Sequence, residues 1–549
     1  MNFLENIFDQ LEAAQDTPLI VRNGTRGTVQ VTGAELLKLV SRARAFLAGK
    51  GLKKGDRCAL LAQNSIRWVA MDLAIMAEGL IAVPLYARQA ADELAAMMKD
   101  CTPSLICCGT PELQEGIQQS WPQAPEIVLF ETIFNNTGQN GKAKPALGPS
   151  DPVTIIYTSG TSGEAKGVVL TAGNIEHMLG CTSDRLSLLM ENKPGQDRVF
   201  HYLPFCFAGS WIMLLTCLRR RSLLTLNSDL NKLSGEMRAA SADYFLNVPA
   251  LLERMRKAVD EQLWQTGGVA QAVYSHAKSA WMHRQEGRKK FSDTVWLALA
   301  NGLIFPAIRK KMIGKSLKAL ICGSAPLNVE TQLYFHMLGI PVLQVYGLTE
   351  TTAICTLDHP KHVEPGRVGP AISGVEMKLG ENEEVIVRGP NVFPGYWNRP
   401  QETAKVLRDG WFHTGDQGEV NAAGNWRIIG RIKNLIILGS GHNIAPEPIE
   451  DAILQHLPKA QQVVLAGNGR GYLSAVVTGD VKPSKVQAAL DAVNPDLPHY
   501  KQIRAFHIRK EPFSIDNGLL TANGKLKRDA IAAQLKPEIE EMYKVKQAV

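Results

Sequence analysis

The strongest chemical signal in the 549-residue sequence is a loop rich in glycine and hydroxyl groups, which follows an apolar segment. Residues 155–171 have the sequence IIYTSGTSGEAKGVVLT. Glycines allow the backbone to approach a phosphate, while N–H groups, hydroxyl groups and a lysine supply donors and positive charge. Lys166 is followed by Gly167, so this is not a Walker A motif. The pattern favours a phosphate-binding loop over a simple surface turn, and its residues are Thr158, Ser159, Gly160, Thr161, Ser162, Gly163 and Lys166.

Three other segments carry groups suited to a nucleotide. YGLTETTA places Tyr346 where its ring can stack on a purine, and Glu350 follows in the same segment. A carboxylate beside a triphosphate is a natural Mg²⁺ ligand, because magnesium prefers oxygen donors. In isolation Glu350 would be a solvated acid. Asp416 ends the turn GWFHTGD and Arg431 follows in GRIKNLI, where a structural salt bridge is the alternative to a role in binding.

A lysine near the C-terminus is the remaining chemical candidate. Lys525 lies in TANGKLKR, after a turn and before an expected helix. Its basic neighbours Lys527 and Arg528 also allow an ordinary surface lysine. The local pattern therefore leaves both interpretations open.

These motifs together resemble the adenylate-forming superfamily, which includes acyl-CoA synthetases, peptide-synthetase adenylation domains and beetle luciferase. The family loop is typically YTSGTTGxPKG, and Glu164–Ala165 depart from it only in its variable part. GSAPL (Gly323–Leu327), YGLTETTA, GWFHTGD, GRIKNLI and LTANGKLKR (Leu520–Arg528) follow in the family order. The resemblance covers nearly the whole chain.

The resemblance implies roles for these residues. ATP would contact the loop described above and Ser324, Ala325, Pro326, Tyr346, Gly347, Thr349, Asp416 and Arg431. Asp416 would bond both ribose hydroxyls, and Thr158 and Glu350 would lie beside Mg²⁺. Lys525, with Glu350 and Lys166, would be catalytic: its charge would stabilise the carboxylate as it attacks the α-phosphate. Lys433 occupies the family's hinge position.

The implied reaction has two halves. A carboxylate attacks the α-phosphate of Mg·ATP to give acyl-AMP and pyrophosphate, and a thiol then displaces AMP. Coenzyme A is the commonest acceptor in the family, and a separate acyl carrier protein presents the same phosphopantetheine thiol. A catalytically inactive binding protein is a further alternative, but such copies usually lose the lysine or the metal carboxylate. A luciferase-type oxygenase shares the fold and is not excluded.

The acyl substrate is indicated by two segments. HYLPFCFAGSW (His201–Trp211) resembles the family segment that borders the acyl pocket, with Phe207 where many relatives have histidine. Trp211 corresponds to a tryptophan near the tunnel mouth of long-chain relatives, and a core tryptophan is the equal alternative. Gly323 is assigned to the same pocket, and residues 265–318 resemble long-chain fatty acyl-CoA synthetases. We expect a medium- or long-chain fatty acid.

The elements that must position these residues alternate in type. From about residue 30 to 115, helical patterns alternate with short apolar strands, which favours a parallel sheet covered by helices. From about Gly366, short strands joined by Gly and Pro turns suggest antiparallel structure. We therefore expect an α/β protein: residues 1–431 form a large domain of helix-covered sheets with a small β-rich subdomain, and 432–549 form a small, mobile α+β C-terminal domain.

Composition limits the cellular setting. The sixty basic and 53 acidic residues give a net charge of +7, a mild excess that suits anionic small molecules or membrane surfaces and does not indicate nucleic acid. Nine cysteines without a C-x-x-C pair predict reduced thiols and a cytoplasmic protein. The apolar stretch 294–308 is shorter than a membrane-spanning helix needs. We favour a buried helix there, and the alternative is an interfacial helix whose basic flanks touch lipid at the inner face of a membrane.

Overall fold

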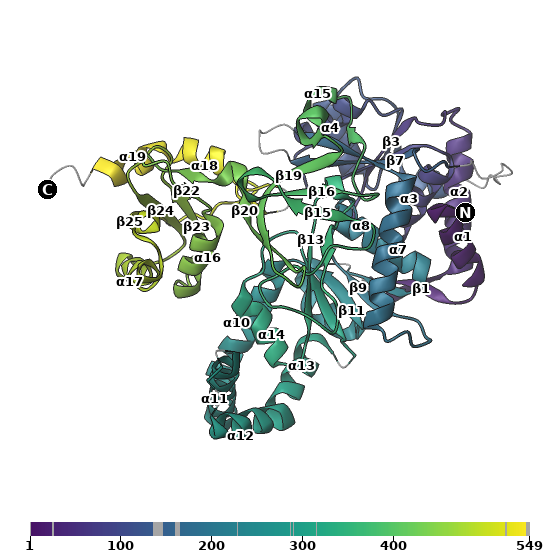
Figure 1. The fold of residues 1–549 in the computed structure, drawn as a ribbon. Helices are drawn as coiled ribbons and strands as arrows, with labels where there is room; N and C mark the ends of the chain where they lie inside the picture. The colour runs from purple at the N-terminus through teal and green to yellow at the C-terminus, as the bar shows by residue number, and fades with distance from the viewer. Residues whose placement is uncertain are drawn as a thin grey trace.

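Two mostly parallel sheets, each with antiparallel strands at its margin, form the centre of the large N-terminal part (Figure 1). The computed structural model describes residues 2–24, 27–135, 147–159, 165–227, 229–285, 287–288, 290–314, 316–521 and 524–544. The surface linker expected from Phe134 to Asp151 therefore lies mostly outside the described residues. The first sheet has the order β17 (Gly395–Tyr396), β8 (Ala165–Thr171), β7 (Pro152–Ser159), β4 (Ile81–Leu85), β3 (Arg57–Leu61), β5 (Leu105–Cys108) and β6 (Ile127–Leu129).

The second sheet has eight strands. Its order is β14 (Thr356–Leu357), β13 (Val342–Tyr346), β12 (Ala319–Cys322), β11 (Tyr244–Asn247), β9 (Arg198–His201), β10 (Leu223–Leu226), β1 (Pro18–Gly24) and β2 (Gly27–Thr32). Neighbouring strands from β13 to β1 are parallel, and the outer strands β14 and β2 pair antiparallel. The loops that follow β9, β12 and β13 therefore leave from the same edge of the sheet, where α/β proteins bind ligands.

Apolar helices join the two sheets into one core. In α3 (Ile66–Ala77) the residues from Trp68 to Ala77 are all buried, which is the pattern of a helix packed on every side. It packs on α2 (Gly33–Ala48), which a Thr32–Glu35 capping box begins. The other helices of the large part are α1 (Phe3–Ala13), α4 (Ala91–Cys101), α5 (Pro111–Ser120), α6 (Phe130–Phe134), α7 (Ala172–Leu189), α8 (Ala208–Arg220), α9 (Leu233–Ala240) and α15 (Pro400–Val406).

A five-stranded antiparallel sheet follows in the chain, as the Gly- and Pro-rich texture predicts. It contains β15 (Glu376–Leu379), β16 (Glu384–Arg388), β19 (Trp411–Val420), β18 (Leu407–Arg408) and β20 (Trp426–Arg431). β20 ends at Arg431 and a short turn of 3₁₀ helix, Ile432–Asn434, leads into the C-terminal part. The proposed boundary after residue 431 coincides with the end of this strand.

The C-terminal part has apolar clusters of its own. They contain residues from Ile436 onward and surround a sheet of β23 (Gln462–Ala466), β24 (Leu473–Thr478) and β25 (Ile503–Arg509). The remaining elements are β21 (Ile436–Ile437), β22 (Asn443–Ile444), α16 (Glu447–His456), α17 (Pro483–Val493), α18 (Arg528–Gln534) and α19 (Lys536–Lys544). The predicted fold class, a mixed α/β protein with a large N-terminal domain and a small C-terminal domain, is thus confirmed.

A helical arm extends from the second sheet (Figure 1). It consists of α10 (Pro249–Thr266), α11 (Gly268–Gln285), α12 (Phe291–Leu299) and α13 (Phe305–Ile313), with α14 (Val329–Met337) near its base. A π-helical turn, Ala300–Ile304, joins α12 and α13 into one helix long and apolar enough, by length and composition alone, to cross a membrane. Only 28% of its most apolar window is buried. The favoured prediction of a buried helix over residues 294–308 is therefore wrong.

All nine cysteines are free, and all but Cys181 are buried. Burial raises the pKa of thiols such as Cys58 and Cys206 to about 12, which keeps them protonated. The expectation of reduced, mostly buried thiols agrees with this arrangement.

Candidate active site

A buried carboxylate lies where three strands meet. Asp416 in β19 is 4% exposed and stands opposite Arg431 in β20. Arg431 Nε lies 2.6 Å from Asp416 Oδ1, and the Tyr346 hydroxyl at the end of β13 donates to Asp416 Oδ2 over 2.7 Å. Burial raises the pKa of Asp416 above its usual value, while Arg431 and then the Tyr346 hydrogen bond act to lower it. The two donors thus stabilise a negative charge that burial alone would disfavour.

A second polar chain connects Glu350 with the base of the phosphate loop. The Tyr396 hydroxyl donates to Glu350 Oε1 over 2.8 Å, and the Lys166 ammonium lies 5.3 Å from the centre of the Tyr396 ring. Lys166 Nζ also lies 2.5 Å from Glu402 Oε2. Thr158 pairs with Lys166 across β7 and β8, so the hairpin brings a hydroxyl and an ammonium to one edge.

The tip of that hairpin falls outside the described residues. Gly160, Thr161, Ser162 and Gly163 belong to it, and nothing is described of the Ser159 side chain. The structure therefore positions the two ends of the expected phosphate loop, Thr158 and Lys166, and leaves the roles of its central residues as predictions.

Lys525 comes from the C-terminal part and faces the same group of charges. The backbone of a turn holds it, because Thr521 N donates to Lys525 O over 2.8 Å. Loss of solvent around the ammonium lowers the pKa of Lys525, and the charge of Arg431 lowers it further, whereas Asp416 and Glu350 act to raise it. The side chain keeps a solvent-exposed side. The structure thus brings the predicted lysine to the predicted nucleotide residues, although it lies 109 residues after Asp416 by their numbering (525 − 416).

Lys433 lies in the 3₁₀ turn between the two parts. Lys433 is exposed, but partial loss of solvent around its ammonium lowers its pKa to about 8, and the neighbouring charge of Arg431 lowers it as well. The charge of Asp529 in α18 raises the same pKa. The pKa of Lys433 therefore depends on charges on both sides of the junction. Its place in the chain agrees with the hinge expectation, and the hinge role itself stays a prediction.

Two loops at the edge of the second sheet approach other backbone closely. A Cβ on Gly347 would lie 2.4 Å from Ala353 O, and one on Gly323 would lie 2.4 Å from Val345 Cγ2. Only glycine fits either position without displacing its neighbours. Ser324, Ala325 and Pro326 follow Gly323 as an exposed loop, with Ser324 in the left-handed region at φ 73°, and Thr349 opens the short helix that carries Glu350.

Two residues assigned to the acyl pocket, Phe207 and Trp211, differ in their burial and in their contacts. Phe207, at the start of α8, is half-buried and its ring lies 5.6 Å from that of Tyr86. Trp211 is fully buried, and its indole N–H donates to Asp72 Oδ2 over 2.8 Å. Burial raises the pKa of Asp72 to about 7, against the lowering effect of that hydrogen bond. Trp211 is thus part of the core in this structure, as the second of the two interpretations expected.

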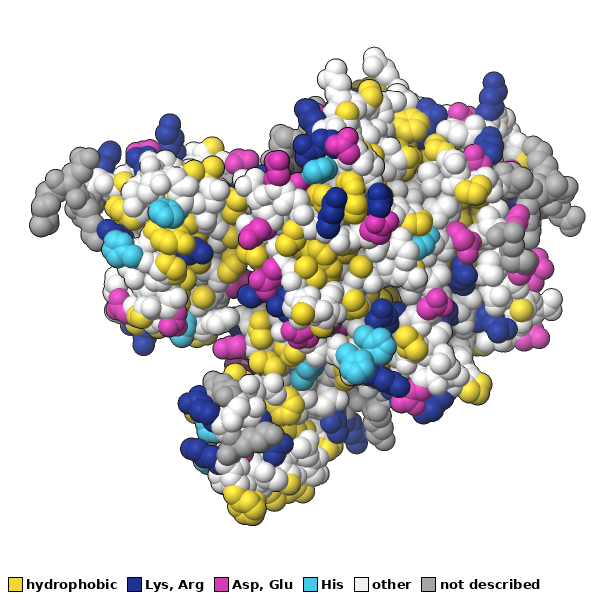
Figure 2. Space-filling model, viewed as in Figure 1, with side chains coloured by type: hydrophobic (Ala, Val, Ile, Leu, Met, Phe, Trp, Pro, Cys, Tyr) yellow, Lys and Arg dark blue, Asp and Glu magenta, His cyan; other side chains and the backbone are white. Residues whose placement is uncertain are grey.

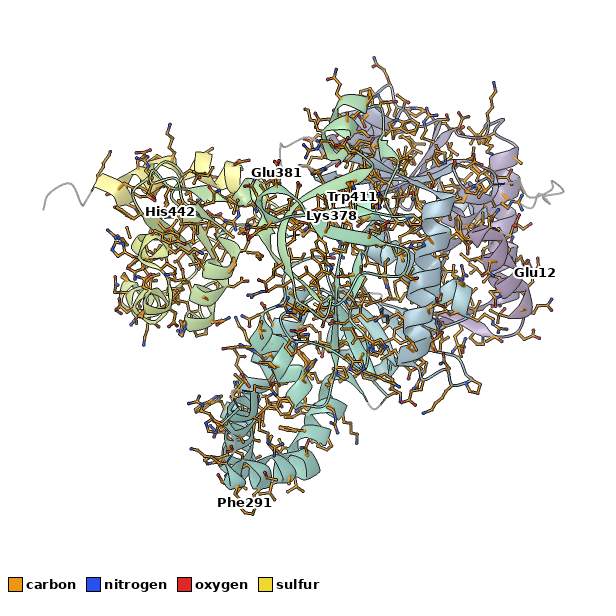
Figure 3. All side chains as sticks on the ribbon, in the orientation of Figure 1. Glu12, Phe291, Lys378, Glu381, Trp411 and His442 are labelled. Carbon is orange, nitrogen blue, oxygen red and sulfur yellow. The ribbon has the colours of Figure 1, made fainter. Side chains whose placement is uncertain are left out.

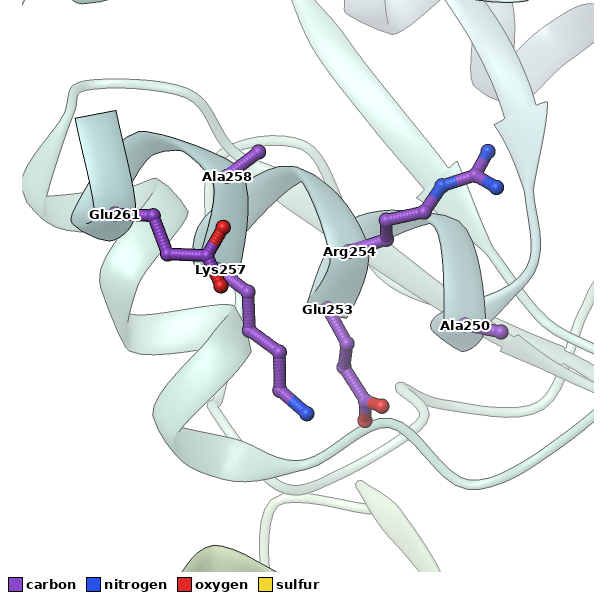
Figure 4. Close-up of a pocket in the computed structure, with 6 residues that line it drawn as sticks. All are labelled: Ala250, Glu253, Arg254, Lys257, Ala258 and Glu261. Atoms are coloured by element: carbon purple, nitrogen blue, oxygen red, sulfur yellow. The ribbon is translucent and has the colours of Figure 1, made fainter. Parts of the chain in front are cut away.

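A shallow pocket lies on the side of α10, lined by Ala250, Glu253, Arg254, Lys257, Ala258 and Glu261 (Figure 4). Glu253 and Lys257 point to the same side of the helix. Asp451 in α16 is exposed, but partial loss of solvent around its carboxyl raises its pKa to about 7, and the Glu450 and Glu253 carboxylates raise it further. Glu253 on α10 therefore acts on the pKa of Asp451 on α16, across the junction between the large part and the C-terminal part.

Several residues that shape the site carry no recognisable signal in the sequence. Tyr396 and Glu402 contact Glu350 and Lys166 from segments far along the chain. Arg528 forms two hydrogen bonds with Glu450, which is 4% exposed, and so ties the segment after Lys525 to α16. In the sequence, Arg528 was noticed only as a basic neighbour of Lys525, and its partner Glu450 could not be predicted.

The fold and this collection of charges define an adenylate-forming enzyme, as the motifs predict. Residues 7–397 match the family described as AMP-binding enzyme, and residues 433–547 match the AMP-binding enzyme C-terminal domain. The chain belongs to the AMP-binding enzyme family.

Individual relatives agree over nearly the full length. The chain is 26% identical to the long-chain-fatty-acid–CoA ligase FadD15 of Mycobacterium bovis, over 93% of this chain and 92% of that protein. It is 26% identical to the chloroplastic long-chain-fatty-acid–[acyl-carrier-protein] ligase AEE15 of Arabidopsis thaliana, over 90% of this chain and 80% of that protein. The ATP-bound structure of MatB from Rhodopseudomonas palustris shares the fold, with a TM-score of 0.74, 24% identity, and coverage of 98% of this chain and 99% of that one.

The hydrogen bond between Tyr346 and Asp416 generates a prediction about pH. In Tyr346→Phe the pKa of Asp416 rises further, because one of the groups that lowers it is lost. The carboxylate is then protonated at a higher pH, so the acidic limb of the pH profile of kcat/KM for ATP should move to higher pH. The control is Tyr244→Phe, which removes a similar 2.9 Å bond to the buried Asp197 outside the site. Equal shifts in both variants would contradict the assignment.

The contact between Arg528 and Glu450 generates a prediction about stability. Removing one partner of a buried ion pair costs about 3 kcal/mol or more, because the other charge stays buried without compensation. Arg528→Ala should lower the free energy of unfolding of the C-terminal part by that amount in a urea titration. It should also reduce adenylation, because the turn that holds Lys525 loses its anchor. Arg509→Ala, whose partner Glu511 is exposed, is the matched control and should have little effect on either.

Proposed function

We propose that this protein activates a medium- or long-chain fatty acid with ATP as acyl-AMP and transfers the acyl group to coenzyme A. The observation that carries the proposal is the position of Lys525, which faces Glu350, Asp416 and Arg431 from the opposite side of the junction. Two anions, the acid and the α-phosphate, must meet in the first step. Lys525 and Arg431 supply positive charge at this point of the fold, which lowers the activation free energy of the attack of one anion on the other.

Each described residue has a chemical task in this proposal. Asp416 accepts hydrogen bonds from the ribose, and Arg431 orients that carboxylate and neutralises phosphate charge. Glu350 and Thr158 offer the oxygen ligands that Mg²⁺ prefers, and the ion would share the charge of the triphosphate. Tyr396 fixes the Glu350 carboxylate through a 2.8 Å hydrogen bond, and Lys166 approaches the phosphates from the edge of the hairpin.

The second half-reaction requires the C-terminal part to turn about Lys433. The proposed boundary between residues 431 and 432 lies at the end of β20, next to this turn. One feature supports such a movement: the C-terminal part has apolar clusters of its own.

The identity of the fatty acid rests on full-length similarity to long-chain ligases. An acyl carrier protein is the second candidate for the acceptor, because a relative named as an acyl-carrier-protein ligase is equally identical over most of this chain. We also propose a cytoplasmic location with peripheral contact at the inner face of a membrane, and no nucleic-acid partner.

The function is tested by incubating the protein with Mg·ATP and a series of carboxylic acids from acetate to palmitate. Pyrophosphate release should be greatest with medium- or long-chain acids in the presence of hydroxylamine, which traps acyl-AMP. Coenzyme A should give a stable thioester, and holo-acyl carrier protein should give little. Preference for acetate or benzoate would contradict the fatty-acid proposal, and a thioester on the carrier protein alone would favour the second acceptor.

Lys525→Ala separates the two half-reactions. It should slow acyl-AMP formation by about a hundredfold or more, because charge stabilisation in the transition state is lost. Thioester formation from supplied acyl-AMP should change little, because that step does not bring two anions together. Lys527→Ala, two residues away, is the matched control and should retain both steps. Equal loss of both steps in Lys525→Ala would argue against the assigned role.

A further inference from the structure

The outer helix of the arm exposes an apolar stripe that the proposed ligase reaction does not use. Figure 3 places Phe291 at the far end of the arm. Its side chain is 89% exposed, Leu303 is 69% exposed, and Val295 and Leu299 are 46% and 41% exposed. Isolated exposed apolar residues are ordinary on a soluble protein, but these four follow one another along a single helix.

The opposite face of the same helix is firmly packed. Leu297, Ala300, Phe305, Ile308 and Met312 are buried in an apolar cluster shared with α10, α11 and α14. A helix attached to the arm along one face cannot leave it to span a bilayer without exposing that cluster. The geometry is that of a helix that lies flat on a surface with one apolar face free.

The π-helical turn keeps the stripe continuous past a proline. Pro306 has no N–H and its ring crowds the carbonyl four residues earlier, which breaks a regular α-helix. Here the Phe305 N–H donates to Ala300 O, five residues back, and the wider turn accommodates the proline. The helix therefore continues from Phe291 to Ile313 with Leu303 exposed at the turn.

Among the described residues from 290 to 313, the exposed charged side chains are all basic. Asp293 is the acid between residues 291 and 313, and it is 4% exposed, accepts from Lys290 N, and lies 3.5 Å from His283 Nδ1. Lys310 and Lys311 are exposed at the C-terminal end of the stripe, and Lys290 is exposed just before its start. Figure 2 shows hydrophobic side chains at the end of the arm with Lys and Arg side chains on both sides.

We propose that this stripe is a membrane-docking surface, which inserts Phe291, Val295, Leu299 and Leu303 between anionic lipids while Lys290, Lys310 and Lys311 contact the head groups. Apolar side chains bind the acyl region, and basic residues bind the negative surface, so both parts of the surface have a matching part in the bilayer. The proposal deepens the proposed function, because a fatty acid partitions into membranes and the arm would hold the enzyme at its substrate. Vesicle binding itself does not depend on catalysis.

Two other occupants fit the observations less well. An acidic carrier protein would meet the lysines, but a soluble acidic surface has no counterpart for four apolar side chains in a row. In a dimer that pairs two copies of the stripe in parallel, the lysines at each end of one stripe would face the same lysines of the other and repel them. A bilayer with anionic lipids satisfies the apolar and the charged residues together.

The test is co-sedimentation of the full chain with vesicles. Wild-type protein should bind vesicles containing phosphatidylglycerol and bind pure phosphatidylcholine more weakly. The double variant Phe291→Ser, Leu303→Ser should bind about tenfold less to both, because apolar insertion is lost. The double variant Lys310→Gln, Lys311→Gln should have an affinity for phosphatidylglycerol vesicles that is lower by about fivefold for each lysine removed. Its affinity for phosphatidylcholine vesicles should change little. Leu188→Ser, at an exposed leucine of α7, is the control and should bind as wild type.

A second readout distinguishes failure of the surface from failure of the enzyme. With a water-soluble acid such as octanoate, all four proteins should release pyrophosphate at the same rate, and only the arm variants should be slower with palmitate supplied in vesicles. Equal vesicle binding by wild type and the serine variant would overturn the proposal, whatever the activity. A concentration-dependent dimer that the serine variant abolishes, or binding to holo-acyl carrier protein that it abolishes, would overturn it in favour of that partner.

Discussion

The buried carboxylate of Asp416 is the charge on which the arrangement of the site depends. Burial disfavours its ionised form, and Arg431 and Tyr346 each bond one of its oxygens. Those donors come from the antiparallel sheet and from the parallel sheet, so the charge is satisfied only when the two sheets keep their positions. The positive charge of Lys525, from the C-terminal part, also lowers the pKa of Asp416. One buried charge thus joins three regions of the chain.

The C-terminal part can present Lys525 because its own packing fixes the lysine turn. Arg528 binds both oxygens of Glu450, and the Leu465 N–H donates to Glu450 Oε1 over 2.7 Å. The end of the lysine segment is therefore connected to α16 and to β23. A body with internal contacts of this kind can change its position as a unit, because its core does not depend on the large part. The backbone conformation then needs to change only in the short turn that contains Lys433.

The sequence predicts the parts of this site that depend on local chemistry. The glycine-rich loop, Asp416, Arg431 and Lys525 each lie in a motif, and periodicity was sufficient for the alternating helices and strands. Long-range partners were not predictable, because nothing in the composition of the segment around Glu402 links it to Lys166, 236 residues earlier. The prediction of a buried helix over residues 294–308 was wrong for a related reason. An apolar run has the same appearance whether neighbouring helices cover one face or every face, and only the packing of α10 and α11 decides this.

The place of the arm in the chain explains how it can carry a surface of its own. It is formed by residues 248–318, between β11 and β12, which pair directly as parallel neighbours. A parallel crossover needs about a dozen residues or a single helix, so most of the arm is not required to build the sheet. Its apolar cluster is separate from the one that joins the two sheets. Its last helix is followed in the chain by β12 and then by the loop at Ser324. The arm can therefore contact an external surface while its base remains fixed to the edge of the sheet that carries the site.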